Sequence, residues 1–439
     1  ALCRAAERGV RVHVLVDGFG ARNFEHDFMP RLLAAGAHVM AYRREFARFR
    51  LRRHRLRRLH RKLAVIDARL AFVGGINIVD DNNAPEGMRP RFDYAVRLEG
   101  PVLRQVRHAV RRMWETVSWA SFKRRFRQAR MAAAGEAAVG SQTAAFLIRD
   151  NIRHRNDILH AYVQAIDGAR EEILIANAYF LPGFRFAHAL NAAARRGVSV
   201  IVLLQGKTDH PLLRYATQAL YPTSMAAGIR IFEYEKSFMH AKVAVIDRHW
   251  ATVGSSNIDP FSLLLAKEAN VVVRDDRFAA ELHASLIQAM EGGAREMSAE
   301  EFTCQPLPAR FLRWLSYALV RALVGDDQPH QERQEAGDRQ RVDAGEVQMV
   351  QHHAPAQPAR LQQRAQQRLL APPTLDLGMV SREQHIRNPS APEFGRPRIV
   401  RMIQQSLPKG VPVRGLFVPQ YAGQEPRCRI DHDQGGQFA

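Results

Sequence analysis

The chain is poor in cysteine: its 439 residues include only Cys3, Cys304 and Cys428. Because these three are odd in number and far apart, they argue against a disulfide framework or a cysteine-bound metal and are typical of a reducing compartment. No uninterrupted apolar run of about 18 residues occurs, so we expect no membrane-spanning helix. No signal peptide is visible, and the chain opens at Ala1 instead of a methionine. The length is sufficient for two domains.

Acidic residues are also in short supply. The 44 aspartates and glutamates face 64 lysines and arginines, which gives a formal net charge of +20. Nearly all of this charge comes from arginine, because the chain has only seven lysines. Such a surplus favours polyanionic partners: nucleic acid, an anionic membrane or a phosphorylated substrate. Composition alone does not choose among them.

Two of the few lysines belong to a motif that occurs twice. Residues 60–67 (HRKLAVID) and 240–247 (HAKVAVID) share the pattern H-x-K-x4-D. In both copies six residues separate the aspartate from a glycine turn that ends in asparagine, at 74–77 (GGIN) and 254–257 (GSSN). The two histidines are 240 − 60 = 180 residues apart, which is a domain-sized spacing. The repetition predicts two half-sites in one chain.

Apolar, β-branched runs alternate with helical patterns that end at glycine, which predicts layered α/β domains. Residues 193–198 closely match residues 5–10, so the second half replays the first. The first half has no counterpart of residues 158–178, and we expect that roughly 45 residues of the first repeat are missing at the N-terminus. We expect helices at 2–9, 28–35, 158–167 and 186–196, and strands at 10–16, 38–41, 172–178 and 198–204.

These patterns predict an α/β protein with two pseudo-repeated domains. We place the first repeat at 1–120 and the second at 146–300, joined by a basic, then alanine-rich linker at 121–145. Residues 301–325 are expected to form an amphipathic C-terminal helix. The tail at 326–439 is rich in Gln, Arg, Pro and His, and we expect it to be disordered.

Two segments have two interpretations each. Residues 43–62 contain ten arginines, which form either a solvated loop or a rim that attracts phosphate or anionic lipid beside the first motif. We favour the rim because His60 lies next to it. Residues 311–323 have apolar side chains at helical spacing with Arg313 and Arg321 among them. They suit an interfacial membrane helix and a helix packed on the domain equally well.

Two histidines in one site are suited to cleaving a phosphodiester through a covalent intermediate. One neutral imidazole can attack phosphorus while the other, protonated, donates to the leaving oxygen, because the usual pKa of histidine lies near working pH. Lysines supply positive charge for the phosphate oxygens, and asparagines donate hydrogen bonds. This arrangement requires no metal and no metal-ligand cluster is visible, so we expect no metal and no cofactor.

Four carboxylates lie near the repeated motifs. Asp67 and Asp247 end their apolar strands, and we interpret them as braces of the following turns. Asp93 and Glu268 stand near the start of the next strand in each half. We expect these two to orient the histidines and keep their protonation states apart. Surface salt bridges are the alternative.

The duplicated H-x-K-x4-D-x6-G-[GS]-x-N pattern over residues 1–325 resembles the phospholipase D superfamily. Within it the chain is most similar to the bacterial cardiolipin synthases, especially the B type. One departure is Gly75, where many members have serine. The segments that carry the closer resemblance are residues 15–20, 60–62, 73–77, 93–101, 176–180 and 250–260.

The resemblance implies two phospholipase D-like domains, each a mixed β-sheet flanked by helices, with the active site at their interface. It also implies a phosphatidyltransferase that makes cardiolipin from two phosphatidylglycerol molecules through a phosphohistidine, with His60 as nucleophile and His240 as acid and base. The implied catalytic residues are His60, Lys62, Asp67, His240, Lys242 and Asp247. The implied phosphate-binding residues are Asn77, Asn257, Gly75 and Ser255, and the histidine-orienting residues are Asp93 and Glu268.

The resemblance further implies a peripheral protein on the cytoplasmic face of the bacterial inner membrane, with anionic phospholipid as its partner. Nucleic acid is not an expected partner, and no protein partner can be inferred. One alternative function is hydrolysis by a phospholipase D or another phosphodiesterase, because acceptor choice depends on the pocket and on water exclusion. The other is a non-catalytic basic protein that binds membranes or nucleic acid, against which the intact motifs argue.

Overall fold

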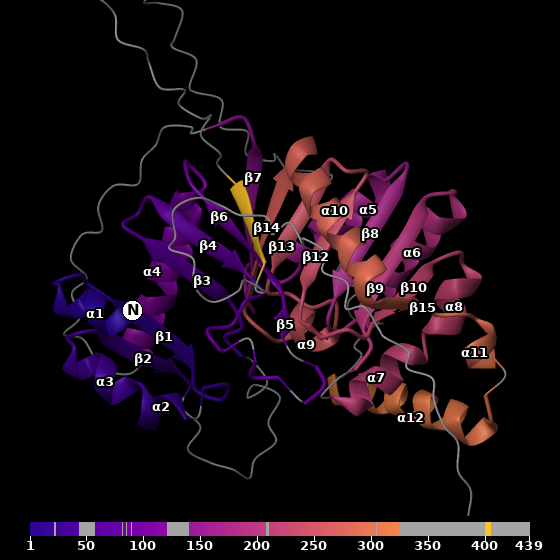
Figure 1. Cartoon of the computed structure of the whole chain (residues 1–439), viewed down its shortest axis with the longest axis horizontal. Helices are drawn as coiled ribbons and strands as arrows, with labels where there is room; N and C mark the ends of the chain where they lie inside the picture. The colour runs from indigo at the N-terminus through magenta and orange to yellow at the C-terminus, as the bar shows by residue number, and fades with distance from the viewer. Residues whose placement is uncertain are drawn as a thin grey trace, which may run out of the picture. The chain divides into compact units, whose positions relative to one another are not determined.

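The computed structural model describes residues 1–43, 58–120, 140–324 and 400–404, except for residues 22, 81, 85, 89, 208, 209 and 304. Two α/β halves lie side by side, the first coloured indigo to purple and the second magenta to orange in Figure 1. The predicted α/β class is therefore confirmed, with a large mixed sheet in the second half, two smaller unmixed sheets in the first half and flanking helices.

The first half has two small sheets. In one, β1 and β2 pair in parallel; in the other, β3, β4 and β6 pair antiparallel. Helix α4 carries buried apolar side chains along one face. The elements are α1 (Leu2–Glu7), β1 (His13–Asp17), α2 (Phe24–Asp27), α3 (Met29–Ala34), β2 (His38–Tyr42), β3 (Lys62–Ile66), β4 (Leu70–Gly74), β5 (Arg91–Phe92), β6 (Tyr94–Leu98) and α4 (Leu103–Ala120).

The second half is built on an eight-stranded sheet in the order β15-β10-β9-β8-β12-β13-β14-β7. Its first strands and helices are β7 (Thr143–Arg149), α5 (Asp157–Gly168), β8 (Glu172–Asn177), α6 (Phe184–Arg195), β9 (Ser199–Gln205), α7 (Pro211–Gln218), α8 (Tyr221–Ala226) and β10 (Arg230–Tyr234). The chain continues through β11 (Phe238–Met239), β12 (Lys242–Ile246), β13 (Trp250–Gly254), α9 (Pro260–Leu264), β14 (Glu268–Arg274), α10 (Asp276–Gly293), β15 (Ala294–Glu296), α11 (Glu300–Thr303) and α12 (Leu307–Val324).

The central strands of this sheet are apolar runs without alternation because both of their faces are covered. Every residue of β12 and β13 is buried. β8, β9 and β10 pair in parallel and the rest antiparallel, which makes the sheet mixed. Strands that are covered on both faces favour such continuous apolar runs.

The two halves differ at one position of the sheet. In the second half, β8 lies between β9 and β12 and joins them. Among the described residues of the first half no strand occupies the equivalent place between β1 and β3, and the sheet is accordingly divided there. This agrees with the comparison of the two repeats within the sequence, in which the first half has no counterpart of residues 158–178.

One hydrophobic core joins the halves. Val73 and Val96 of the first half and Val253 and Val271 of the second belong to the same buried cluster, and each is no more than 1% exposed. The inner face of α10 completes this cluster. The shared core holds β3 and β12, the strands that begin at the two predicted lysines, in one unit.

Two predicted boundaries need correction. β7 begins at Thr143, inside the predicted linker at 121–145, because residues 143–149 pair with β14 along its whole length. Cross-strand pairing overrides the low strand propensity of the alanines there. Residues 121–139 lie outside the described part of the chain. In the tail expected to be disordered, β16 (Val400–Gln404) is a strand that pairs with β6; the remaining residues after 324 are not described.

Candidate active site

The two motifs occupy equivalent places in the halves. His60 and His240 each lie two residues before a lysine that starts a central strand, β3 or β12. The backbone N–H of His60 donates to the carbonyl of Lys267 at 3.0 Å, and that of His240 donates to Phe92 at 2.7 Å. Each histidine is thus attached to the opposite half of the chain.

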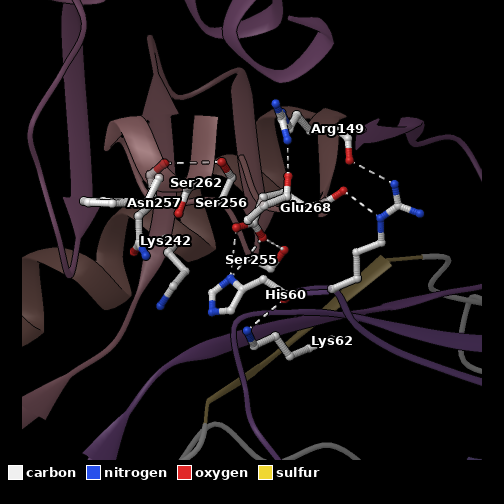
Figure 2. A network of polar contacts seen from close by, with 12 residues as sticks. His60, Lys62, Arg149, Lys242, Ser255, Ser256, Asn257, Ser262 and Glu268 are labelled. Atoms are coloured by element: carbon white, nitrogen blue, oxygen red, sulfur yellow. Dashed lines mark hydrogen bonds and ion pairs between the residues drawn. The ribbon is translucent and has the colours of Figure 1, made fainter. Parts of the chain in front are cut away.

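The orienting carboxylates are also exchanged between the halves. Nδ1 of His60 lies 3.0 Å from Oε1 of Glu268, and Nδ1 of His240 lies 2.7 Å from Oδ2 of Asp93. Both carboxylates are fully buried. Figure 2 shows His60 and Glu268 pointing toward each other from different elements. The structure therefore places each predicted carboxylate beside a predicted histidine. In both pairs the carboxylate and the histidine belong to different repeats.

These contacts determine which ring nitrogen is free to react. An ionised carboxylate only accepts hydrogen bonds, so Nδ1 of each imidazole carries the proton. In a neutral imidazole Nε2 then has a lone pair. This tautomer suits attack on phosphorus by one ring and proton transfer by the other.

Each lysine contacts the histidine of its own motif. Nζ of Lys62 donates to the carbonyl of His60 at 2.8 Å, and Lys242 donates to the carbonyl of His240. Burial lowers the pKa of Lys62 to about 7 and that of Lys242 to about 8, with Glu268 and Asp93 opposing the shifts. Burial and the charge of Lys242 lower the pKa of His240 to about 3, so its ring is neutral in the free protein.

We expect these lysines to make anion binding depend on pH. Tungstate keeps its charge between pH 7 and 9, whereas Lys62 and Lys242 lose theirs as pH rises through pKa values of about 7 and 8. Bound anion restores the protons, so the affinity should fall with rising pH by up to about tenfold per pH unit for each proton taken up. Isothermal titration calorimetry in two buffers measures both affinity and proton uptake. A flat affinity without proton uptake would contradict the shifted lysines.

The glycine turns explain why Gly75 stands where many members of the family have serine. A Cβ at Gly75 would lie 2.3 Å from Oδ1 of Asp93, so this carboxylate occupies the space that a side chain would need. At the matching position Ser255 is accommodated, and its hydroxyl donates to Glu268 at 2.5 Å. The structure thus gives the Ser255 hydroxyl a carboxylate partner (Figure 2), and its role toward phosphate stays a prediction.

Gly75→Ala is expected to damage one half-site selectively. The methyl group displaces the Asp93 carboxylate from His240 while leaving His60 and Glu268 in contact. We expect kcat to fall about 10- to 100-fold, the usual effect of a displacement near 1 Å in a catalytic group. Gly168→Ala is the matched control, because a Cβ added at Gly168 would meet no atom within 4 Å. Equal kcat values for Gly75→Ala and the unaltered protein would show that Asp93 tolerates the methyl group.

The asparagines of the glycine turns lie in the same region. Asn257 is 5% exposed, and its Oδ1 has no hydrogen-bond partner in the described part of the structure. Asn77 is half-buried. Their expected role as hydrogen-bond donors to phosphate stays a prediction.

The aspartates of the two motifs lie at the opposite ends of their strands from the lysines. Asp67 and Asp247 follow the far ends of β3 and β12, about 16 Å along the strand from the lysines at 3.3 Å per residue. Both have a positive φ, 49° and 50°, and form hairpin turns. Asp247 accepts three backbone N–H groups, from Arg170, Glu171 and Glu172. These three contacts support the interpretation of Asp247 as a brace of its turn, and the catalytic role implied for both aspartates stays a prediction.

Sequence reasoning missed one arginine of the network. Arg61 donates from Nε to the carbonyl of Glu268 at 2.9 Å and from Nη2 to the carbonyl of Arg149 at 3.0 Å. It thereby ties the first motif to β14 and β7. No signal indicated this role, because the second motif has Ala241 at the same position.

The predicted basic rim lies mostly outside the described residues, which include Arg43, Arg58 and Arg61 from it. The guanidinium of Arg58 stacks 4.1 Å from the ring of Phe19. Within the described ranges, no group of three or more His, Cys, Asp or Glu side chains is arranged to hold a metal ion.

Two similar halves that exchange carboxylates around two histidines and two lysines define a phosphodiester-transfer site of the phospholipase D-like class. The sequence matches the family described as "Cardiolipin synthase, PLD-like domain" over residues 1–114 and 162–290. The chain belongs to this family, which confirms the resemblance seen in its motifs.

Curated relatives and a solved structure agree with this assignment. Cardiolipin synthase B of Escherichia coli K12 is 42% identical over 286 residues, which cover 65% of this chain and 68% of the relative. The minor cardiolipin synthase ClsB of Bacillus subtilis 168 is 28% identical over 325 residues, covering 72% and 76%. The fold matches the phosphatidylserine synthase of Haemophilus influenzae Rd KW20 with a TM-score of 0.53 at 12% identity, over 73% of this chain and 84% of that one.

Proposed function

We propose that this protein is a phosphatidyltransferase that makes cardiolipin from two phosphatidylglycerol molecules and releases glycerol. The exchanged histidine–carboxylate pairs carry the proposal, in a chain 42% identical to a cardiolipin synthase B. The half-buried Lys62 and the fully buried Lys242 contact the carbonyls of the two histidines and supply the charge that a phosphodiester requires. The site has every group that a metal-free transfer through phosphohistidine uses.

The reaction proceeds in two displacements. Nε2 of His60 attacks phosphorus, and the bond between phosphorus and the glycerol oxygen breaks while His240 donates a proton to that oxygen. His240 is neutral in the free protein and gains this proton when the anionic phosphodiester enters, because a nearby negative charge raises the pKa of an imidazole. A hydroxyl of the second phosphatidylglycerol then attacks phosphorus, gives its proton to His240 and releases His60.

Lipid mass spectrometry tests the transfer against its rivals. The purified protein is incubated with phosphatidylglycerol vesicles, and the expected products are cardiolipin and free glycerol in equal amounts. Phosphatidic acid and glycerol would instead establish hydrolysis by a phospholipase D. Binding with a steep salt dependence and no turnover would support a non-catalytic basic protein.

We propose further that the protein works at the cytoplasmic face of the bacterial inner membrane as a peripheral protein. None of the helices in the described ranges is long and apolar enough to cross a membrane. The net charge of +20 suits an anionic surface. Helix α12 lies along α7 (Figure 1), and the buried Val320 packs with Leu181 and Ala216.

The outer face of α12 offers a contact surface for lipid. Phe311 and Trp314 are each 60% exposed, their rings stack at 5.9 Å, and Leu307 and Leu323 are also exposed. One face of this helix packs on the domain, and the other presents apolar side chains that suit the proposed contact with lipid. Aromatic residues with arginine nearby are typical of interfacial helices.

Trp314→Glu is expected to weaken vesicle binding. A carboxylate on the outer face opposes burial in the acyl boundary and is repelled by anionic headgroups. We expect at least about a tenfold loss of binding to phosphatidylglycerol vesicles in a flotation assay. Trp119→Glu on α4 is the matched control, because Trp119 is also exposed, at 76%, but belongs to the first half. Equal losses for both variants would remove α12 as the membrane contact.

A further inference from the structure

A second matched pair of side chains lies directly behind the two histidines. The backbone N–H of Leu59, the residue before His60, donates to Oδ1 of Asp17 at 3.1 Å. The backbone N–H of Met239, the residue before His240, donates to Oε1 of Gln205. In both halves one side chain thus holds the residue that leads into a histidine.

Asp17 and Gln205 are equivalent in the repeat. Each lies twelve residues beyond the start of the matching segments, since 17 − 5 = 12 and 205 − 193 = 12. Asp17 ends β1 and Gln205 ends β9, and these strands are also equivalent. The same contact has therefore been kept by two different side chains, one charged and one neutral.

The glycine after each residue fixes the direction of this contact. The backbone N–H groups of Gly18 and Gly206 donate to the carbonyls of Tyr42 and Tyr234, both at 2.9 Å. A Cβ at Gly18 would lie 2.8 Å from the carbonyl of Arg43, and one at Gly206 would lie 3.0 Å from the carbonyl of Tyr234. At this glycine the end of each strand lies against its neighbouring strand. The side chain of the residue before the glycine, Asp17 or Gln205, therefore points toward the histidine segment.

The remaining contacts of the pair show how firmly each is held. Oδ2 of Asp17 accepts the N–H groups of Phe19 at 3.3 Å and Gly20 at 3.2 Å. Nε2 of Gln205 donates to the carbonyl of Ser237 at 3.2 Å, and Gln205 is 6% exposed. Both side chains are satisfied at their far ends, so the oxygen that faces the histidine segment has a defined position.

We propose that Asp17 and Gln205 are positioning residues for His60 and His240, and that the charge of Asp17 breaks the symmetry of the site in favour of a cationic His60. The inference rests on the proposed function. A phosphorylated imidazole that keeps its Nδ1 proton is positively charged, and Glu268 together with Asp17 places two carboxylates on that side. On the His240 side the orienting carboxylate is Asp93. The position equivalent to Asp17 holds the neutral Gln205.

The charge of Asp17 also acts on the lysine of the first motif. The charge of Asp17 is among those that raise the pKa of Lys62 against the larger effect of burial. The carboxylates that act in this way on Lys242 are Asp93, Glu268 and Asp259. Removing the charge of Asp17 should therefore lower the pKa of Lys62 further and leave Lys242 largely unaffected.

Three variants separate position from charge. Asp17→Ala removes the acceptor and the charge, Asp17→Asn keeps an acceptor oxygen without the charge, and Gln205→Leu removes a neutral acceptor at similar volume. Loss of either acceptor should lower kcat about 10- to 100-fold with little change in KM. Asp17→Asn should recover much of that loss, yet move the basic limb of the kcat/KM pH profile to lower pH. Gln205→Leu should leave that limb in place.

Tungstate affinity measured against pH keeps the test independent of the lipid substrate. Asp17→Asn should weaken binding more at pH 7.5 than at pH 6.5, and Gln205→Leu should not. Unchanged kcat in Asp17→Ala, with unchanged thermal stability, would overturn the positioning role. A pH profile and tungstate titration in Asp17→Asn that match the unaltered protein would overturn the role of charge. If phosphatidylglycerol is not turned over at all, the proposed function fails, and the tungstate titration still decides this inference.

Discussion

Alanine at His60 or His240 should abolish cardiolipin formation from phosphatidylglycerol, with rates at least about 10⁴-fold lower for either variant, as for other residues that act as one catalytic unit. Without His60 no group attacks phosphorus, and without His240 no proton reaches the leaving glycerol. The double variant should be scarcely worse than either single variant, because the two rings serve one reaction. Cardiolipin and glycerol are quantified by mass spectrometry in each case.

The same variants test the order of the two histidines. In His240→Ala, a substrate with a good leaving group should still phosphorylate His60, because such a group departs without a proton. An alkaline quench and peptide mapping would then locate the phosphate on residue 60, and His60→Ala should yield no phosphopeptide. Phosphate on residue 240 in His60→Ala would reverse the assignment. His154→Ala is the control, since His154 also pairs through Nδ1 with a carboxylate, Asp157, at 2.7 Å, and both are partly exposed.

Glu268→Gln should lower kcat about 10²- to 10⁴-fold, the range seen when a buried carboxylate that orients a catalytic histidine becomes an amide. The amide can present a donor to Nδ1 of His60, which favours the wrong tautomer and moves the lone pair away from phosphorus. Because the exchange between halves joins Glu268 to His60, the variant should behave like His60→Ala and form little phosphohistidine. Asp93→Asn should instead behave like His240→Ala and still be phosphorylated.

Glu233→Gln controls for burial of the carboxylate. Glu233 is also fully buried, but it is held by Arg214, Gln218 and Tyr221 and contacts neither histidine. Its replacement should lower thermal stability and leave the rate per folded molecule near that of the unaltered protein. If Glu268→Gln were phosphorylated normally while Asp93→Asn was not, each carboxylate would have to serve the histidine of its own half, and the exchanged site would be wrong.

The sequence was most informative where the signal is local. The helices predicted at 2–9 and 186–196 were expected to end at glycine, and positive φ angles at Gly9 and Gly197 confirm this. The two repeated motifs lie at the starts of equivalent strands, β3 and β12. The pairing of Asp93 with His240 and of Glu268 with His60 could not be predicted in this way. No local sequence pattern indicates which of two similar halves supplies the carboxylate for a given histidine. Arg61 had no repeated counterpart, and residues 143–145 formed a strand only through pairing with β14.

The exchange also has a consequence for the order in which the molecule becomes active during synthesis. The ribosome completes the first half at Ala120, the end of α4, which is 240 − 120 = 120 residues before His240, and this half then contains His60 without Glu268. A nascent first half therefore has a histidine whose tautomer is not set and a lone Asp93 with no imidazole to hold. Catalysis can therefore begin only when β14 has been made and docked against the first half, so an incomplete chain is inactive.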